Sequence, residues 1–192
     1  IGHDHHHVEE VAEVKYVVLA GGIPEKKLVD KLKNAGIKVI AFAPSLLIAK
    51  KMVANYGVDA LIIEGNEAGG HIGPTSTLIL AQEILPFMKE VPVFVAGGIA
   101  TGAVMAQFLE MGSSRVQIGT LFVCTHECIA HPKFKEAFIK AKARHAEATI
   151  QLDKSFPIIP VRAISNKGTE EFLKVQKNAI DRFYKGELSK EE

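Results

Sequence analysis

The chain has 192 residues, of which 47% are hydrophobic and 23% are charged, and its formal net charge is +1. Enough apolar surface is available for a packed core, which excludes a disordered chain. The balance of 23 basic against 22 acidic side chains excludes the broad positive field of a typical nucleic-acid-binding protein, so no nucleic-acid partner is expected.

The N-terminal end carries a histidine cluster made of His3, Asp4, His5, His6 and His7. Such a cluster could bind a divalent metal ion, but a solvated loop is the favoured interpretation. The chain also begins with Ile1 and not with methionine, which suggests a fragment of a longer protein.

Short apolar runs recur along the first two thirds of the chain. They do not alternate between polar and apolar residues, as the strands of a half-exposed sheet do. Continuous β-branched runs indicate parallel strands that are covered on both faces. The runs occupy residues 16–20, 39–42, 60–63, 93–96 and 116–118.

Helical patterns separate these predicted strands. Apolar residues recur at spacings of three and four, as on the buried face of a helix. Gly36, Gly57 and Gly112 each follow a helical pattern and precede a strand, as C-terminal helix caps do. The helical faces include Leu28, Val29, Leu32 and Ala35; Leu46, Leu47, Met52 and Val53; Leu78, Ile79, Ile84, Leu85 and Met88; and Ala103, Ala106 and Leu109.

Alternating strands and helices are typical of two architectures, the open doubly wound sheet and the eight-stranded βα barrel. Five strands suffice for the first and cannot close the second. After Thr120 the pattern changes. Residues 121–145 predict a helix, 146–165 an irregular segment with two prolines, and 166–192 a helix with a charged tail.

Glycines follow three consecutive predicted strands, in residues 64–73 (EGNEAGGHIG), 96–99 (AGGI) and 117–120 (QIGT). The carboxyl ends of parallel strands are where both architectures place their ligands. Glycine lets a backbone approach a ligand closely and leaves N–H groups free to bind a phosphate. Any one of these glycines could serve only a tight turn, but three in succession favour a ligand site.

His71 lies within the first of these segments. A neutral imidazole can accept a proton near pH 7, so His71 is the candidate catalytic residue. A loop histidine bonded to the backbone is the alternative, and the flanking glycines favour the catalytic role.

The segments EGNEAGGHIG, PVFVAGGIATG and SRVQIGTLF, in this order, resemble the nitronate monooxygenase family. That family was formerly called 2-nitropropane dioxygenase and includes the flavin-type enoyl-acyl-carrier-protein reductases. The following ECIAHPKFKEAFIKA is similar to the segment after the last barrel strand there. The resemblance covers roughly residues 14–175.

The resemblance implies an FMN-binding TIM barrel of which about five of the eight strands are present. Residues 1–145 would form strands four to eight, and strands one to three would be missing. Residues 146–192 would belong to the smaller region that covers the substrate.

Matching the family's motifs position by position implies His71 as the catalytic histidine. Gly97 and Gly98 would hold the FMN phosphate together with residues 117–120, and Glu64 and Gly69 would line the flavin. The full set of implied cofactor-binding residues is Glu64, Gly69, Gly70, Gly97, Gly98, Gln117, Ile118, Gly119 and Thr120.

The resemblance leaves two reactions open. A nitronate monooxygenase oxidises alkyl nitronates or nitroalkanes with oxygen to a carbonyl compound and nitrite. An enoyl reductase uses NAD(P)H to reduce an enoyl thioester, with acyl carrier protein as a partner. Glu64 stands where the monooxygenases commonly have glutamine, and Glu64 with Ile72 look more like the enoyl reductases.

A non-catalytic relative that binds a phosphate-bearing ligand is a third alternative. A homodimer is compatible with the family, and its members act on small-molecule substrates.

Two further patterns lie after the fifth predicted strand. Cys124, His126, Cys128 and His131 resemble a set of metal ligands, but the segment matches the family's helix start without a metal, so no metal site is expected. The Phe134 and Phe138 pair has the spacing of neighbours on one helix face and predicts a core contact.

The two cysteines cannot form a disulfide framework, so a reducing cytoplasm is the expected compartment. No apolar run approaches the ~20 residues of a membrane-spanning helix, so no membrane partner is expected. No signal-peptide pattern is visible at the N-terminus.

Overall fold

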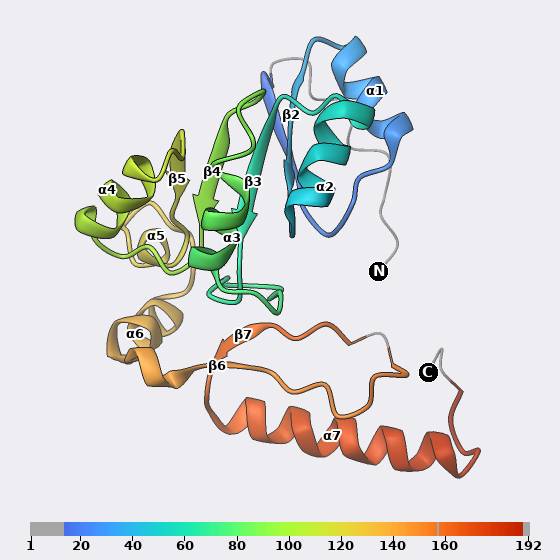
Figure 1. The fold of residues 1–192 in the computed structure, drawn as a ribbon. Helices are drawn as coiled ribbons and strands as arrows, with labels where there is room; N and C mark the ends of the chain where they lie inside the picture. The colour runs from blue at the N-terminus through green and yellow to red at the C-terminus, as the bar shows by residue number, and fades with distance from the viewer. Residues whose placement is uncertain (1–13, 157, 190–192) are drawn as a thin grey trace.

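The computed structural model describes residues 14–156 and 158–189, and its main feature is a five-stranded parallel sheet (Figure 1). The strands pair in chain order, each with the next. A doubly wound sheet reverses its strand order, whereas a barrel wall does not. The fold is therefore α/β with five strands of a TIM-type barrel wall: β1 (Tyr16–Leu19), β2 (Lys38–Phe42), β3 (Ala60–Glu64), β4 (Val93–Ala96) and β5 (Arg115–Gln117).

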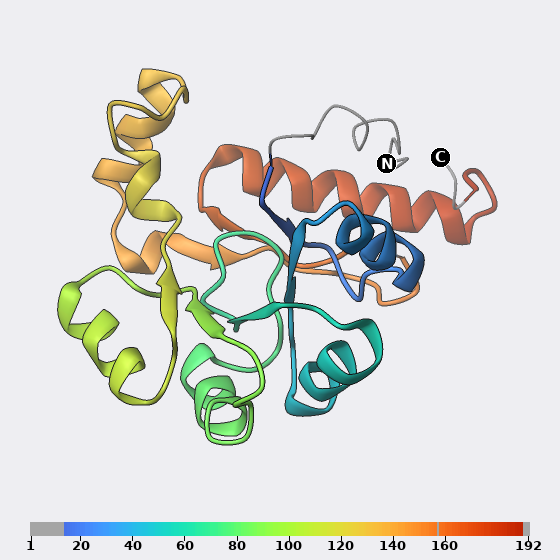
Figure 2. The ribbon, with the colours of Figure 1, turned by 90° about the horizontal axis from the view of Figure 1, so that it is seen from above.

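The helices between the strands all lie on one side of this wall. Figure 2 views the strands from above, and the four helices follow one another around the outside of the curved sheet. All five predicted strands and the four predicted helices are confirmed to within a few residues. The helices are α1 (Lys26–Asn34), α2 (Leu46–Lys51), which continues as the π-helical segment η2 (Met52–Tyr56), α3 (Thr77–Ile84) and α4 (Gly102–Glu110).

The main hydrophobic core lies between these helices and the sheet, where it includes Val29, Met52, Leu61 and Ile84, all fully buried. Because side chains alternate along a strand, Ile62 points to the opposite face from Leu61. There Ile62 forms a second, smaller cluster with Ile40, Ala60 and Ala96. Apolar packing on both faces, as the continuous runs predict, is therefore found in the central strands.

Glycines end three of the helical segments in the left-handed backbone region. Gly36 follows α1 with φ +77°, Gly57 follows η2 with φ +68°, and Gly112 follows α4 with φ +102°. Residues with a Cβ rarely adopt these angles, so the predicted caps are confirmed and have a physical cause.

The chain after β5 departs from the prediction of one helix over residues 121–145. It forms α5 (Thr120–Val123), α6 (Pro132–Lys140) and the 3-10 turn η3 (Ala143–His145). Pro132 has no N–H to donate and disfavours a helical residue before it. His131 accordingly has an extended ψ of 140°, and a new helix begins after it.

The last part of the chain forms a unit of two strands and one helix, called the C-terminal unit (residues 146–156 and 158–189). The segment 146–165, predicted to be irregular, contains the antiparallel pair β6 (Ala146–Ala148) and β7 (Arg162–Ile164). The predicted terminal helix is α7 (Lys167–Tyr184). Figure 1 shows this unit lying across the carboxyl ends of the parallel strands.

Over residues 14–156 and 158–189, no helix is both long enough and apolar enough to cross a membrane. The histidine cluster at residues 3–7 lies outside the described residues.

Candidate functional site

A cavity of about 640 Å³ opens at the carboxyl ends of β3, β4 and β5. This volume is in the range of pockets that hold cofactors and small molecules. All nine residues predicted to bind the cofactor contribute to its wall. The lining consists of Glu64, Glu67, Gly69, Gly70, Gly97, Gly98, Ile99, Ala100, Gln117, Ile118, Gly119, Thr120, Val123, Phe134 and Phe138.

Thr77 joins the loop that follows β3 to the last residue of β4. Its hydroxyl accepts a hydrogen bond from the N–H of Gly65 at 3.0 Å and donates to the carbonyl of Ala96 at 3.3 Å. Thr77 is only 2% exposed, so water cannot replace its hydroxyl as the hydrogen-bond partner of these two backbone groups. A Cβ at Gly65 would lie 2.2 Å from the backbone nitrogen of Thr77, so the loop requires glycine there.

Glu67 packs the β3 loop against the glycines that follow β4. Its carboxylate accepts a hydrogen bond from the N–H of Thr77 at 2.8 Å. A Cβ on Gly98 would lie 3.1 Å from the Cβ of Glu67, and one on Gly97 would lie 3.2 Å from the nitrogen of Ala68. Gly97 and Gly98 also have φ of +85° and +73°, so the fold itself requires glycine at both positions.

Three other glycines of the cavity wall have no such internal reason. A Cβ added to Gly70 or Gly119 would have no heavy atom within 4 Å. A Cβ added to Gly69 would meet only the hydroxyl of Thr120, at 3.7 Å. None of the three has a positive φ. A side chain at these positions would enter open space beside the cavity, as expected where a ligand lies against the backbone.

His71 lies at the rim of the cavity. It directly follows Gly70, which lines the cavity, but its own side chain is exposed and is not part of the wall. Its backbone forms an antiparallel bridge with Val161 of the C-terminal unit. The structure thus brings the predicted histidine to the edge of the predicted cofactor residues and not among them.

Glu64 places a carboxyl group in the cavity wall at the end of β3. The side chain is half-buried, and this burial raises the pKa of Glu64 above its ordinary value. The carboxyl is therefore protonated more readily than a surface glutamate, and in that state it can donate a hydrogen bond to a ligand.

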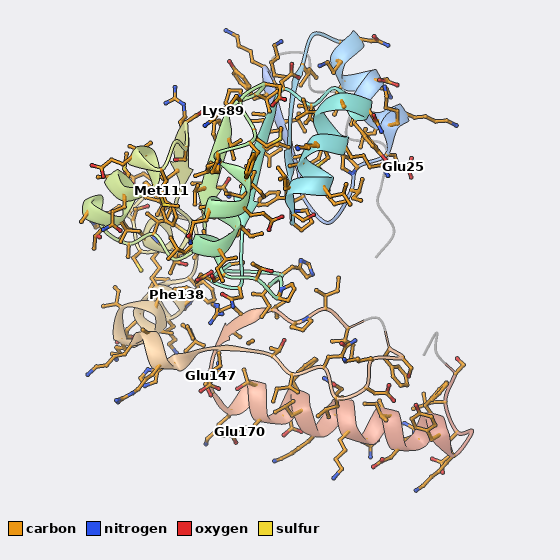
Figure 3. All side chains as sticks on the ribbon, in the orientation of Figure 1. Glu25, Lys89, Met111, Phe138, Glu147 and Glu170 are labelled. Carbon is orange, nitrogen blue, oxygen red and sulfur yellow. The ribbon has the colours of Figure 1, made fainter. Side chains whose placement is uncertain are left out.

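Phe134 and Phe138 line the cavity and do not belong to the core, so the predicted core contact is wrong. Their ring centroids are 4.8 Å apart, and Phe134 is 52% exposed. The break before Pro132 takes α6 out of the outer helix layer, and α6 has no buried residue. Figure 3 labels Phe138 on the side of α6 nearer to the parallel sheet.

Glu67, Thr77 and the two phenylalanines are the site residues that sequence reasoning missed. The capping pattern at the start of α3, where the Ser76 hydroxyl accepts from the N–H of Ile79 at 3.4 Å, could have drawn attention to Thr77. The four-residue spacing of the phenylalanines indicated that the two rings are neighbours. Whether such a pair lies in the core or in a cavity wall depends on the elements around it, which the spacing does not show.

Within the described ranges, no three His, Cys, Asp or Glu side chains are grouped so that they could hold a metal ion. In the segment that resembles a metal-ligand set, the ring Nδ1 of His131 accepts a hydrogen bond from the N–H of Lys133 at 3.2 Å. The thiols of Cys124 and Cys128 are free and half-buried.

A model of the family described as nitronate monooxygenase matches residues 4–191 of the chain. A probable nitronate monooxygenase of Staphylococcus aureus is 30% identical over 180 residues, which are 88% of this chain and 48% of the relative. A Rhodococcus jostii protein named as a dehydrogenase of a hydroxy-methyl-oxo-octahydro-indene-carboxyl-CoA is 39% identical over 118 residues, which are 60% of this chain and 32% of the relative.

Solved structures show the same similarity. FabK from Thermotoga maritima superposes with a TM-score of 0.77 at 34% identity, over 94% of this chain and 54% of that one. A nitroalkane oxidase from Streptomyces ansochromogenes gives a TM-score of 0.68 at 29% identity, over 83% and 47% of the two chains. The chain thus spans about half the length, or less, of the relatives it matches.

Proposed function

Because this chain belongs to the nitronate monooxygenase family, we propose that it is the part of an FMN-dependent oxidoreductase that holds the cofactor's phosphate and one side of its ring. The observation that carries the proposal is the presence in the cavity wall of Gly69, Gly70 and Gly119, for which the chain offers no internal reason. The cavity lies at the carboxyl edge of the barrel wall, where barrels of this type bind phosphates.

The cavity also offers hydrogen-bond donors that suit a phosphate. Among the described residues, the N–H groups of Gly97, Gly98 and Gly119 donate no hydrogen bond to an acceptor of the chain. Backbone N–H groups in glycine-rich turns bind anions well because no side chain hinders the approach. These three residues therefore form the proposed phosphate cradle, while Glu64, Gly69 and Gly70 lie along the ring.

When bound, FMN supplies the electron transfer, and the chain supplies binding, orientation and proton movement. The reaction that we propose first is the oxidation of an alkyl nitronate by oxygen to a carbonyl compound and nitrite. His71 at the cavity rim is the candidate base that takes the proton from the α-carbon of a neutral nitroalkane. The Phe134 and Phe138 rings offer apolar surface to the substrate's alkyl group.

A second candidate is the reduction of an enoyl thioester by NAD(P)H through FMN. It is supported by Glu64 in the cavity wall, because this position is commonly glutamine in the monooxygenases. The Rhodococcus relative, whose name contains a carboxyl-CoA compound, supports a thioester as the substrate. Coenzyme A or acyl carrier protein would carry the thioester.

Replacing Gly119 by alanine tests the cofactor site without disturbing the fold. Alanine fits the backbone and meets no heavy atom within 4 Å, so the stability of the chain should not change. The added methyl group should weaken FMN binding roughly tenfold or more, because it occupies space proposed for the cofactor. The measurement is the FMN dissociation constant of the full-length protein, obtained from quenching of flavin fluorescence.

Gly102→Ala is the matched control, since Gly102 also meets no heavy atom within 4 Å and does not line the cavity. It should leave FMN affinity unchanged. Equal affinity in Gly119→Ala and Gly102→Ala would contradict the proposed cradle. A wild-type protein that binds no FMN but does bind another phosphate-bearing molecule would favour the non-catalytic alternative. Turnover with a nitronate, compared with turnover with NAD(P)H and an enoyl thioester, separates the two reactions.

A further inference from the structure

Arg162, at the start of β7, reaches from the C-terminal unit to the loop between Glu64 and His71. Its guanidinium donates to three backbone carbonyls, those of Asn66, Ala68 (3.2 Å) and Ala146 (2.7 Å). Two of these carbonyls belong to the loop and the third to β6. Among the described residues, no ion pair involves Arg162, so its charge is directed to carbonyl oxygens and not to a carboxylate.

The backbone around Arg162 runs alongside the same loop. The N–H of Arg162 donates to the carbonyl of Gly70 at 3.0 Å, and the N–H of Ile72 donates to the carbonyl of Pro160 at 3.1 Å. Between them, His71 and Val161 form an antiparallel bridge. Both the main chain and the side chain of this segment therefore hold residues 66–72.

The hydrogen bond from Arg162 to the carbonyl of Ala68 fixes the direction of the N–H of Gly69, which belongs to the same peptide unit. A peptide unit is planar and trans, so the N–H of Gly69 points opposite to the carbonyl of Ala68. Because that carbonyl points to Arg162, the N–H of Gly69 points away from the guanidinium. Gly69 lines the cavity, and its N–H donates no hydrogen bond to any acceptor in the described part of the chain.

We propose that Arg162 is a positioning residue for the cofactor site, which sets the loop of residues 66–72 so that the N–H of Gly69 faces the bound ligand and His71 stays at the cavity rim. This inference rests on the function proposed above. Arginine suits the task because its rigid fork of donors can hold several carbonyls at once, whereas the single ammonium of lysine cannot hold the same three.

Amide hydrogen exchange of the full-length protein without cofactor tests the positioning directly. In Arg162→Ala, exchange at the hydrogen-bonded amides of this loop, those of Asn66, Ala68 and Ile72, should become at least about tenfold faster, because the charge-assisted hydrogen bonds that hold the loop are lost. Arg162→Lys should show a smaller increase. Arg182→Ala is the matched control: Arg182 lies on α7, is exposed and pairs with Glu187 at 3.7 Å, so its loss should not affect the loop.

A separate amide reports whether the C-terminal unit itself remains folded. The N–H of Leu152 donates to the side chain of Gln176 at 2.6 Å, far along the chain from the loop. It should stay protected in all three variants. A general loss of structure would release Leu152 together with the loop, whereas loss of positioning releases the loop alone.

FMN affinity and kcat of the full-length protein provide a second test. Arg162→Ala should weaken FMN binding by about tenfold, and millimolar guanidinium should restore part of the affinity by filling the vacated position. If Arg162 acts through the loop, its removal should lower kcat much less when His71 is already alanine, since coupled residues are not additive.

Unchanged exchange of residues 66–72 in both Arg162 variants would overturn the proposal, as would fully additive effects with His71→Ala. If Arg162→Ala releases Leu152 as well, Arg162→Lys decides: the loop must exchange faster than in the wild type while Leu152 stays protected, and otherwise the proposal fails. A wild-type protein that binds no FMN contradicts the proposed function alone, because the exchange experiment needs no cofactor.

Discussion

His71 is exposed and lies at the rim of the cavity, next to Gly70 of the cavity wall. A positioned acid or base typically contributes 10²- to 10⁴-fold in rate. The variant His71→Ala should therefore keep its fold and its flavin but lose activity of about that size on a neutral nitroalkane or an enoyl thioester. Steady-state kinetics on both substrates, together with the flavin content of the variant, provide the measurement.

A preformed nitronate serves as the internal control for this variant. It has already lost its α-proton, so its oxidation should be much less sensitive to His71→Ala. Wild-type rates on the neutral substrates would instead show that His71 is only a loop residue whose backbone pairs with Val161.

Thr77 shows how a single hydroxyl can hold a site together. It accepts from the loop after β3 and donates to the last residue of β4, and Glu67 accepts from its N–H in turn. A valine of the same shape would leave the buried N–H of Gly65 and one acceptor unpaired, which costs more than a lost surface hydrogen bond. The cavity therefore depends on a residue that does not line it.

Asp59 ties two elements of the wall together, in the turn between η2 and β3. Its carboxylate accepts from the N–H of Val39 at 2.9 Å and lies 3.2 Å from the Lys38 ammonium and 3.3 Å from that of Lys33. Burial raises the pKa of Asp59, but the hydrogen bonds from Val39 and the two lysines outweigh it and hold the pKa below its ordinary value.

A lowered carboxyl pKa contributes stability that is present above the unfolded value and lost as pH falls through the folded one. Asp59→Asn keeps an oxygen for Val39 but removes the charge. It should lower the free energy of unfolding by about 1 kcal/mol at pH 7, with the deficit shrinking as pH falls below about 4. Urea unfolding of both proteins at neutral and acidic pH measures this.

Asp30→Asn is the matched control, because Asp30 forms an exposed pair with Lys26 one helical turn away. Such pairs contribute little, so this variant should unfold like the wild type at every pH. A deficit for Asp59→Asn that persists undiminished in acid would contradict the electrostatic account.

The elements that could be predicted from the sequence are those with local signals. Continuous β-branched runs identified the five strands. Gly36, Gly57 and Gly112 marked the ends of helices, because the left-handed backbone angles of a helix end favour glycine whatever the tertiary structure around it. The three-residue strands β6 and β7 are too short to show a period, and they exist because they pair with each other.

The candidate site was likewise predictable only where its signals are local in the sequence. Its glycines follow strands directly, so the sequence alone places them at one edge of the sheet. The contact of Arg162 with Asn66 spans 96 residues, and no local pattern signals it. The position of Phe134 and Phe138 likewise depends on where α6 packs after the break at Pro132, which is a property of the tertiary structure.

At the scale of the whole molecule, β1 and β5 each pair on one side only in the part of the chain that the structure describes. On β1, Tyr16 and Val18 are 64% and 47% exposed, while Val17 and Leu19 pack against the core. An unpaired apolar strand edge is a template for association with another chain. The 192-residue chain on its own should therefore self-associate, which sedimentation velocity over a range of concentrations can measure.

Val18→Lys should reduce this association, because a charge on an edge strand opposes pairing between chains. Leu47→Lys is the matched control, since Leu47 is equally apolar and 76% exposed but lies on α2. A wild-type chain that stays monomeric at every concentration would show that β1 does not behave as an open edge.

The chain-order pairing of the sheet also bears on synthesis. Each strand of the wall finds its partner in the strand made just before it, so the wall can grow while the chain leaves the ribosome, one strand and one helix at a time. The loop of residues 66–72 is the exception, because Arg162 and Pro160, which hold it, are made only after all five strands of the wall. The ligand site is thus finished only after the wall that carries it has been made.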